Sequence, residues 1–198
     1  MRKLLIGVDE AGRGPLAGPV AVGVVAVPRR FDFKLLKGVR DSKQMSELGR
    51  EIWFERLRAL EAEQKLRYIV VFSSATTIDE FGITRAVRRA VHRGVRHVAP
   101  EPAGARILLD GLLTAPREYE QETIVGGDDS EPLIALASVA AKVRRDRLMR
   151  RHALRYPQYG FEAHKGYGTK AHREALMKHG LCDIHRGTYC KVEMWRKK

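Results

Sequence analysis

The chain has 198 residues, of which 44% are hydrophobic and 31% are charged, and this mixture excludes an intrinsically disordered chain. Its 37 Lys and Arg residues against 24 Asp and Glu residues give a net charge of +13, which favours a polyanionic partner such as nucleic acid. No apolar stretch has the length of a signal sequence or a membrane-spanning helix, so we expect a cytoplasmic protein that binds no membrane. Cys182 and Cys190 are then expected to be free thiols.

Short apolar segments alternate with longer helical patterns along the chain. Strands are predicted where the segments are short, apolar or β-branched, over residues 4–8, 19–27, 67–72, 106–109 and 122–125. Helices are predicted over residues 46–64, 77–97, 132–154 and 170–179. The third of these helices is rich in arginine in its second half, which we expect to face nucleic-acid phosphates. This order of elements predicts an α/β sheet of mixed direction in a single domain over residues 1–198.

Acidic residues follow three of the predicted strands. Asp9 and Glu10 end the first strand, and Asp110 ends a later one. The pair Asp128 and Asp129 follows the last strand, and ligand sites of α/β sheets gather beyond the carboxyl ends of strands. Converging carboxylates repel one another, so we expect them to bind hard divalent cations, and two such ions would serve phosphodiester hydrolysis. Adjacent strand residues point to opposite faces, so we expect the first strand to end or bend between Asp9 and Glu10.

A glycine-rich segment links the first two predicted strands and carries a family resemblance. Residues 7–20 read Gly-Val-Asp-Glu-Ala-Gly-Arg-Gly-Pro-Leu-Ala-Gly-Pro-Val, which resembles the N-terminal signature of the type 2 ribonuclease H family, ribonuclease HII. Further matches follow in the family's order at residues 41–43, 78–80, 109–111, 127–128, 137–146, 156–157, 164–169 and 184–186. The resemblance covers most of the chain, from residue 4 to residue 189.

The resemblance implies a ribonuclease H-like fold with a mixed five-stranded sheet flanked by helices, and a small helical C-terminal region over residues 170–198. It implies an endoribonuclease that hydrolyses the RNA strand of RNA–DNA hybrids and cuts 5′ of single ribonucleotides embedded in duplex DNA. The implied mechanism uses two metal ions, Mg²⁺ or Mn²⁺, and leaves a 5′-phosphate and a 3′-hydroxyl. Such an enzyme would serve DNA replication and ribonucleotide excision repair.

The resemblance also assigns the site. The catalytic and metal-binding carboxylates are Asp9, Glu10, Asp110 and Asp128, and the last is preferred to Asp129 because it follows a glycine and stands ten residues before Ser138. The substrate-binding residues are Gly12, Arg13, Gly14 and Tyr167 at the ribose, Ser42 and Lys43 at a phosphate, and Lys165 at the duplex. His164, His185 and Arg186 could also face the duplex, but such histidines are more often polar packing residues, so His185 is left out of the predicted site. Lys142, Arg145 and Asp146 are expected to be structural.

Two other hypotheses belong to different classes of protein. The alternative function is a non-catalytic basic RNA–DNA hybrid-binding protein on the same fold, which would gain nothing from acids that face phosphate. A related type 3 enzyme is disfavoured, because that type has an extra N-terminal domain and the motif here begins at residue 9. We expect a monomer whose partner is an RNA–DNA hybrid or ribonucleotide-containing duplex DNA. Residues 191–198 contain no convincing motif for binding a sliding clamp.

Overall fold

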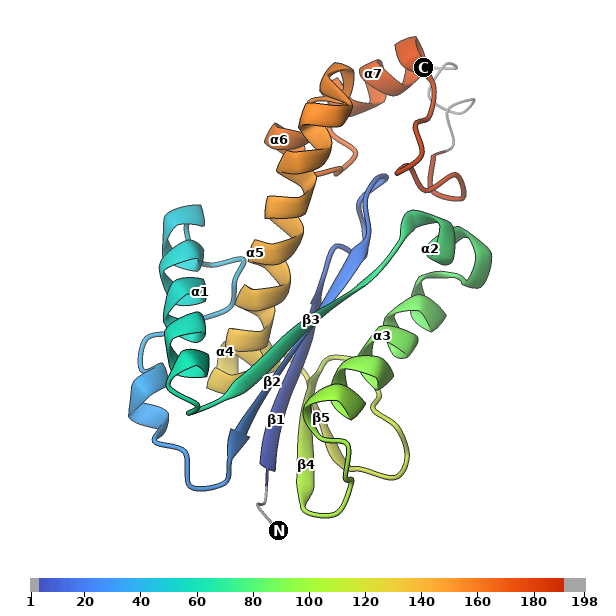
Figure 1. The fold of residues 1–198 in the computed structure, drawn as a ribbon. Helices are drawn as coiled ribbons and strands as arrows, with labels where there is room; N and C mark the ends of the chain where they lie inside the picture. The colour runs from blue at the N-terminus through green and yellow to red at the C-terminus, as the bar shows by residue number, and fades with distance from the viewer. Residues whose placement is uncertain (1–3, 191–198) are drawn as a thin grey trace.

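A computed structural model describes residues 4–190 of the chain, so the prediction about residues 191–198 lies outside the described residues. Five strands form one sheet: β1 (Leu4–Ala11), β2 (Val20–Pro28), β3 (Arg67–Ser73), β4 (Ala105–Asp110) and β5 (Glu120–Ile124). Their order across the sheet is β3-β2-β1-β4-β5 (Figure 1). β2 runs antiparallel to β1 and β3, whereas β4 is parallel to β1 and β5 is parallel to β4. The predicted mixed five-stranded sheet is confirmed.

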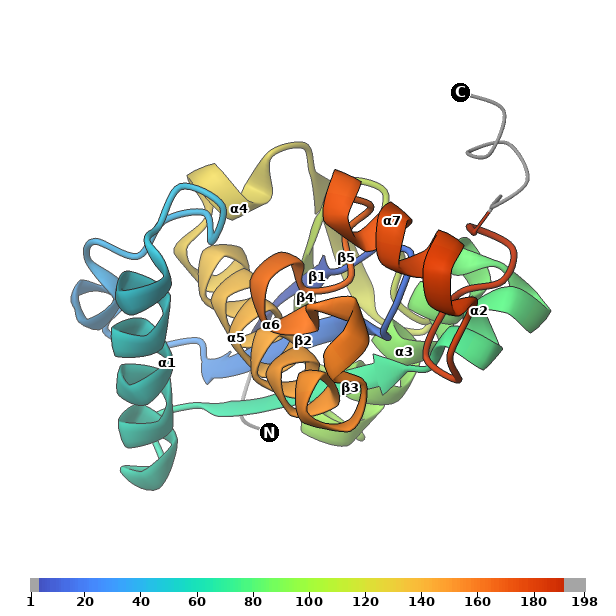
Figure 2. The same ribbon diagram turned by 90° about the horizontal axis from the view of Figure 1, so that it is seen from above.

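Helices cover both faces of this sheet. α3 (Ile83–Val98) packs on one face, and α5 (Pro132–Arg155) packs on the other with α1 (Glu47–Ala62) beside it (Figures 1 and 2). The shorter helices are α2 (Ala75–Phe81), α4 (Gly127–Ser130), α6 (Phe161–His164) and α7 (Lys170–His179), with 3₁₀ turns η1 (Phe33–Leu36) and η2 (Pro157–Tyr159). None of the helices within residues 4–190 is long and apolar enough to cross a membrane.

The helix predicted over residues 77–97 is wrong as one element. The chain forms α2 and α3 there, separated by Gly82, whose φ of 75° lies outside the helical region. Glycine reaches this conformation without a steric penalty, so the second helix starts in a new direction. The helix predicted over residues 46–64 is found as α1, and the Ser46 side chain caps it by accepting a hydrogen bond from the Gly49 amide.

Alternation along β1 and β2 assigns each side chain to one of two cores. Ile6 and Val8 belong to the core under α3, whereas Val25 and Val27 belong to the core under α5 and α1. This period of two puts Asp9 on the α5 face and Glu10 on the α3 face.

Glycines let α5 approach the sheet closely. A Cβ atom at Gly23 would overlap the carbonyl oxygen of Ala137 in α5. We expect Gly23→Ala to lower the free energy of unfolding by about 1–3 kcal/mol, because neither backbone can move aside cheaply. Gly14→Ala is the matched control, since a Cβ atom there meets nothing within 4 Å. Denaturant unfolding measures both variants, and equal stabilities would contradict the close contact between α5 and the sheet.

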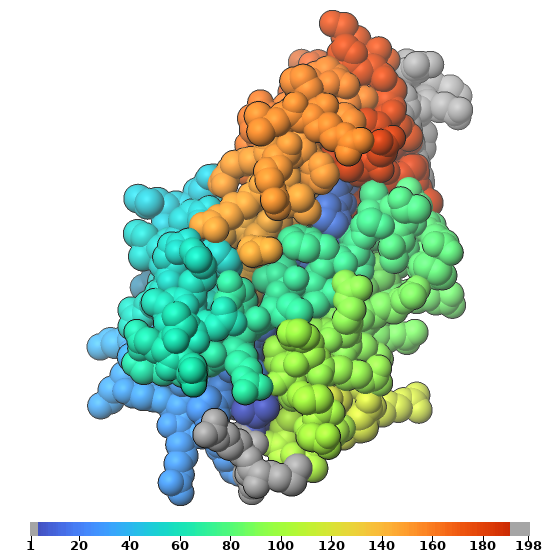
Figure 3. Space-filling view, viewed as in Figure 1, coloured from blue at the N-terminus to red at the C-terminus, as the bar shows by residue number. Residues whose placement is uncertain are grey.

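The second half of α5 extends beyond the sheet and packs against the C-terminal segment. α6 and α7 lie past the upper end of the sheet in Figure 1 and in front of it in Figure 2, and they contribute to a small core of their own. Figure 3 shows the loop after β1, in blue, between α5 in orange and the C-terminal segment in red. Two loop amides, those of Leu16 and Ala17, donate to the carbonyl of Gly166 at 2.8 and 3.3 Å.

Two arginines in the second half of α5 are paired with acids of α1. Arg147 binds Glu51 and Glu55 of α1, and Arg150 binds Glu47 of the same helix. These ion pairs join α5 to α1 and neutralise part of the positive charge. These two arginines are less available to a phosphate than we expected, and the contact of the arginine-rich end of α5 with nucleic-acid phosphates stays a prediction.

Candidate active site

The sheet brings three of the predicted carboxylates to one end. The parallel pairing of β1 with β4 ends at Val8 opposite Leu109, and the next residue of each strand is an acid, Asp9 or Asp110. α4 begins just after β5, and the amide of Asp128 lies 3.4 Å from Oδ1 of Asp110. The carboxyl ends of parallel neighbours therefore meet where the sequence predicted.

Of the two expected alternatives, an end or a bend of β1 between Asp9 and Glu10, the structure excludes the end. The strand continues to Ala11, and both acids stay paired with β2, opposite Gly23 and Val22. The edge that faces β4 differs, because the β1–β4 pairing has already stopped there. Burial is the main cause of the raised pKa of both acids, and the negative charge of Asp110 adds to it.

Asp9 is the most strongly perturbed acid of the group. Only 3% of the residue is exposed, and burial together with the charges of Glu10 and Asp110 raises its pKa to about 8. A hydrogen bond from Ser138 of α5 acts in the opposite direction. Burial also raises the pKa of Glu10, and Arg13, whose Nη1 lies 3.3 Å from Glu10 Oε1, opposes that rise.

Asp128 and its neighbour Asp129 occupy different surroundings. Asp128 is 6% exposed, and its Oδ2 accepts a hydrogen bond of 2.9 Å from Nζ of Lys43. Asp129 is exposed, and its Oδ1 accepts a hydrogen bond of 3.0 Å from the side-chain nitrogen Nε2 of Gln44. Of the two acids, Asp128 is the one that lies against Asp110 in the interior of the site.

The Ser42 hydroxyl is buried, which is at odds with the predicted contact between it and a substrate phosphate. Its Oγ lies 2.8 Å from Oγ of Ser138, the residue that also bonds Asp9. Ser42 thus supports the acid through Ser138, a partner that the sequence did not identify. The next residue, Lys43, keeps most of its side chain exposed beside Asp128.

The oxygen atoms of the four acids are the ligands that a hard divalent cation prefers, but the side chains do not surround a common point. Within residues 4–190, no three His, Cys, Asp or Glu side chains are grouped closely enough to hold a metal ion. Glu10 and Asp128 are each turned to a cationic side chain, Arg13 and Lys43. Four oxygen-donor side chains against two flexible cations leave a negative site, which suits a divalent cation.

The residues predicted to contact sugar lie together beside these acids. The glycine-rich loop is bonded through its backbone to Gly166, next to Tyr167. The Tyr167 ring is partly exposed, and the cationic groups of Lys142 and Arg145 lie 5.9 and 5.8 Å from its centre. Lys165 is half-buried, and its carbonyl accepts a hydrogen bond from Arg145.

Arg186, a candidate for facing the duplex, is buried, and so is His185, which is left out of the predicted site as a packing residue. Arg186 bonds the carbonyls of the glycine-rich loop, and His185 Nε2 lies 3.1 Å from Nε2 of His172. The segment resembled the family motif, but nothing in it distinguished a buried arginine from an exposed one. Arg145, which was expected to be structural, is also buried.

The buried histidine pair makes the stability depend on pH. Burial lowers the pKa of both His172 and His185 to about 4, from an ordinary value of 6.5. The unfolded chain binds more protons between these values, so this contribution to stability is present above pH 6.5 and is lost as the pH falls towards 4. We expect His172→Gln to flatten this loss relative to wild type, whereas His97→Gln, at an exposed position, leaves it unchanged. Urea unfolding at pH 7.5 and pH 5 measures the difference, and parallel profiles for wild type and His172→Gln would contradict it.

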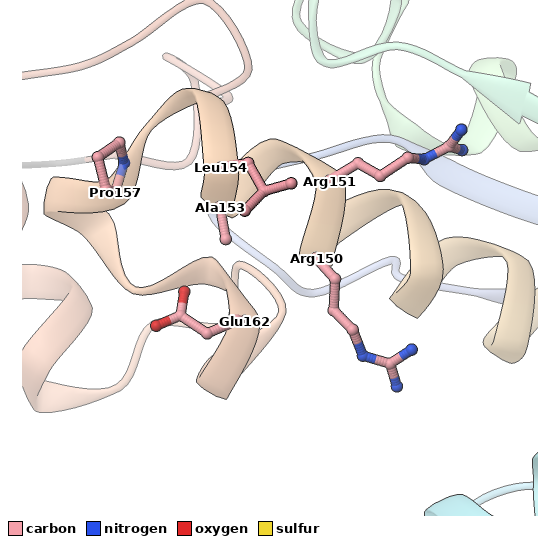
Figure 4. Close-up of a pocket in the computed structure, with 6 residues that line it drawn as sticks. All are labelled: Arg150, Arg151, Ala153, Leu154, Pro157 and Glu162. Carbon is pink, nitrogen blue, oxygen red and sulfur yellow. The ribbon is translucent and has the colours of Figure 1, made fainter.

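A shallow pocket at the far end of α5 is separate from these residues. It has a volume of about 440 Å³ and is lined by residues of α5, η2 and α6: Arg150, Arg151, Ala153, Leu154, Pro157 and Glu162 (Figure 4). Arg150 stands twelve residues after Ser138 on α5, a rise of about 18 Å. None of the four acids lines this pocket, so we exclude it as the reaction site.

A mixed sheet of this topology, with carboxylates gathered at the ends of its central strands, defines a ribonuclease H-like hydrolase. The fold is similar to that of the Archaeoglobus fulgidus RNase HII solved in complex with PCNA, with a TM-score of 0.76 and 25% identity over 94% of this chain and 95% of that one. It is also similar to Bst-RNase HIII solved with Mn²⁺, with a TM-score of 0.74 and 18% identity over 97% of this chain and 68% of that one.

The family follows from the sequence comparison. The family model described as Ribonuclease HII matches residues 6–192. A Ribonuclease HII of Endomicrobium trichonymphae is 47% identical over 94% of this chain and 85% of that protein. The chain therefore belongs to the ribonuclease HII family, and it is an endoribonuclease of the ribonuclease H type.

Proposed function

We propose that this protein hydrolyses the RNA strand of RNA–DNA hybrids and cuts 5′ of single ribonucleotides in duplex DNA, leaving a 5′-phosphate and a 3′-hydroxyl. The observation that carries the proposal is the position of a glycine-rich backbone loop directly beside converging carboxylates. Glu10 and Gly12 are separated by one residue, so a ribose at the loop has its phosphate near the acids. The net charge of +13 supports a polyanionic substrate.

The same proposal assigns Mg²⁺ or Mn²⁺ to Asp9, Glu10, Asp110 and Asp128. Divalent ions in such a site activate the attacking water and stabilise the leaving oxygen. The Mn²⁺ in the structure of the ribonuclease HIII neighbour supports an ion of this type. These four carboxylates would hold the ion, and the cationic groups that now lie against two of them, Lys43 on Asp128 and Arg13 on Glu10, would have to move aside. Lys43, largely exposed beside Asp128, could then bind a substrate phosphate as a point charge.

Recognition of the ribose falls to the loop and to Tyr167. At Gly12, Arg13 and Gly14 the backbone can approach a sugar closely, and the 2′-hydroxyl is the group that distinguishes RNA from DNA. The exposed part of the Tyr167 ring packs against the next sugar, while Lys165 contributes positive charge near the duplex. We further propose that the protein acts as a monomer in the cytoplasm, without a membrane partner.

Three labelled substrates test this function. They are a DNA duplex with one ribonucleotide, the same duplex without it, and a continuous RNA–DNA hybrid. With Mg²⁺ we expect a cut 5′ of the lone ribonucleotide and cuts along the hybrid, but none in all-DNA duplex or in EDTA. Tight binding of the hybrid without any cut would favour the non-catalytic alternative. Cleavage of the hybrid alone would remove the single-ribonucleotide activity from the proposal.

A further inference from the structure

Arg186 is fully buried, and all three nitrogens of its guanidinium group donate hydrogen bonds to the glycine-rich loop. Its Nη1 and Nη2 each donate a hydrogen bond of 2.7 Å, to the carbonyls of Arg13 and Gly12, and its Nε donates one of 3.0 Å to the carbonyl of Gly18. Its own amide donates to the carbonyl of Leu16 at 2.8 Å. The residue is 0% exposed. One guanidinium therefore fixes both ends of the glycine-rich loop.

Arg145 holds the loop from the α5 side. It is 1% exposed, and its Nε, Nη1 and Nη2 donate to the carbonyls of Pro19, Lys165 and Ala17 at 2.9, 3.0 and 3.2 Å. The bond to Lys165 ties the loop to the segment that carries Tyr167. A Cβ atom at Gly12, whose φ is +93°, would overlap the Arg145 guanidinium. The loop and the two arginines are thus fitted to each other without space between them.

Both buried guanidinium groups donate their hydrogen bonds to neutral carbonyls and lie near a tyrosine ring, without a hydrogen bond to a carboxylate among the described residues. Desolvation of a charged group costs several kcal/mol, and an apolar side chain of similar volume is commonly as stable or more so. What the guanidinium provides that an apolar side chain cannot is a planar set of donors in fixed directions. It therefore imposes an orientation on the carbonyls that it binds.

The orientation of these carbonyls determines where the loop amides point. In a trans peptide the C=O and the following N–H lie on opposite sides. The carbonyls of Gly12 and Arg13 point inward to Arg186, so the amides of Arg13 and Gly14 point outward, where both residues are exposed. Within residues 4–190 neither amide donates a hydrogen bond.

We propose that Arg186, with Arg145, is a positioning residue that holds the Arg13 and Gly14 amides towards the substrate ribose and so sets the preference for a ribonucleotide over a deoxyribonucleotide. The inference rests on the proposed function, in which this loop reads the sugar. Asp79 of α2 supports the arrangement, because it accepts hydrogen bonds from the amides of Gly187 and Thr188, which directly follow Arg186. The donors that read the sugar are then fixed before the substrate binds.

Binding in EDTA tests the inference apart from catalysis. The Kd is measured for a duplex with one ribonucleotide and for the identical all-DNA duplex, with wild type, Arg186→Lys and Arg145→Lys. We expect wild type to prefer the ribonucleotide duplex. We expect each variant to lose about tenfold of this preference, the effect of one or two hydrogen bonds, while its Kd for all-DNA duplex stays within about twofold. Arg93→Lys is the control, since Arg93 also bonds a backbone carbonyl, that of Phe72, but on an exposed helix face.

An unchanged ribonucleotide preference in both Arg→Lys variants overturns the inference, and so does a parallel loss of affinity for both duplexes, which marks a merely structural role. If Arg186→Lys does not fold, Arg186→Ala with added methylguanidinium replaces it, and recovery of the preference with methylguanidinium but not methylammonium is expected. Absence of that recovery, in a folded protein, contradicts the inference. Lack of any preference in wild type overturns the proposed function itself.

Discussion

Replacing Asp9 by Asn is expected to abolish cleavage while making the metal-free protein more stable. The acid is buried among like charges, and its pKa is raised from 3.8 to about 8. Its ionised form therefore costs stability in the fold, and this cost grows as the pH rises from about 4 to 8. Asparagine keeps the shape but cannot ionise, so the variant avoids the cost.

The expected gain in the free energy of unfolding is on the order of 1–3 kcal/mol at pH 8.5, and it disappears below about pH 4. Cleavage with Mg²⁺ falls by more than ~100-fold, because the loss of a direct metal ligand exceeds the loss of an outer partner. Asp183→Asn, at an exposed position, is the matched control for both measurements. An Asp9→Asn protein that is inactive and also less stable at pH 8.5 would contradict this prediction. It would show that favourable contacts already stabilise the ionised Asp9 carboxylate in the metal-free protein.

Asp128→Asn is expected to lower cleavage by more than ~100-fold, whereas Asp129→Asn keeps most of the activity. The two acids are neighbours in sequence, but only Asp128 is buried beside Asp110. Both variants lose one negative charge, so the pair separates the role of a ligand from a change in overall charge. Asp128→Asn also frees Lys43, whose largely exposed side chain makes the change in stability less than about 1 kcal/mol.

Single-turnover rates with saturating Mg²⁺ measure this pair of variants. The opposite result, with Asp129→Asn inactive and Asp128→Asn active, would assign the fourth position to the exposed acid. Equal losses in both variants would instead indicate that the α4 turn as a whole is disturbed. Thermal unfolding of each variant identifies that case.

The sheet and the ends of its strands were predictable because both depend on local patterns. Residues 4–8 and 19–27 are apolar and β-branched, and burial on both faces leaves such segments few other structures. Asp9 and Asp110 follow strands that are parallel neighbours, so their meeting is a consequence of topology. The break at Gly82 was missed because one glycine inside a helical pattern is often tolerated.

The hydrogen bonds that hold the site residues in place could not be predicted, because they join residues far apart in the chain. Ser42 bonds Ser138 across 96 residues, and Arg186 reaches the carbonyl of Gly12 across 174. Neither contact has a local pattern, since serine and arginine are ordinarily surface residues. The end expected for β1 after Asp9 was wrong for a similar reason: pairing with β2 continues on one edge after pairing with β4 has stopped on the other.

The central claim is that these carboxylates hold metal against the scissile phosphate, and sulfur substitution tests it most directly. A duplex with one ribonucleotide is prepared with a phosphorothioate at the bond 5′ of that ribonucleotide, and its diastereomers are separated. Sulfur is a softer ligand than oxygen, so it binds Mg²⁺ poorly and Mn²⁺ better. We predict that one diastereomer is cut slowly with Mg²⁺ and recovers most of its rate with Mn²⁺. A slow rate that is the same with both metals would contradict a metal ion at the phosphate.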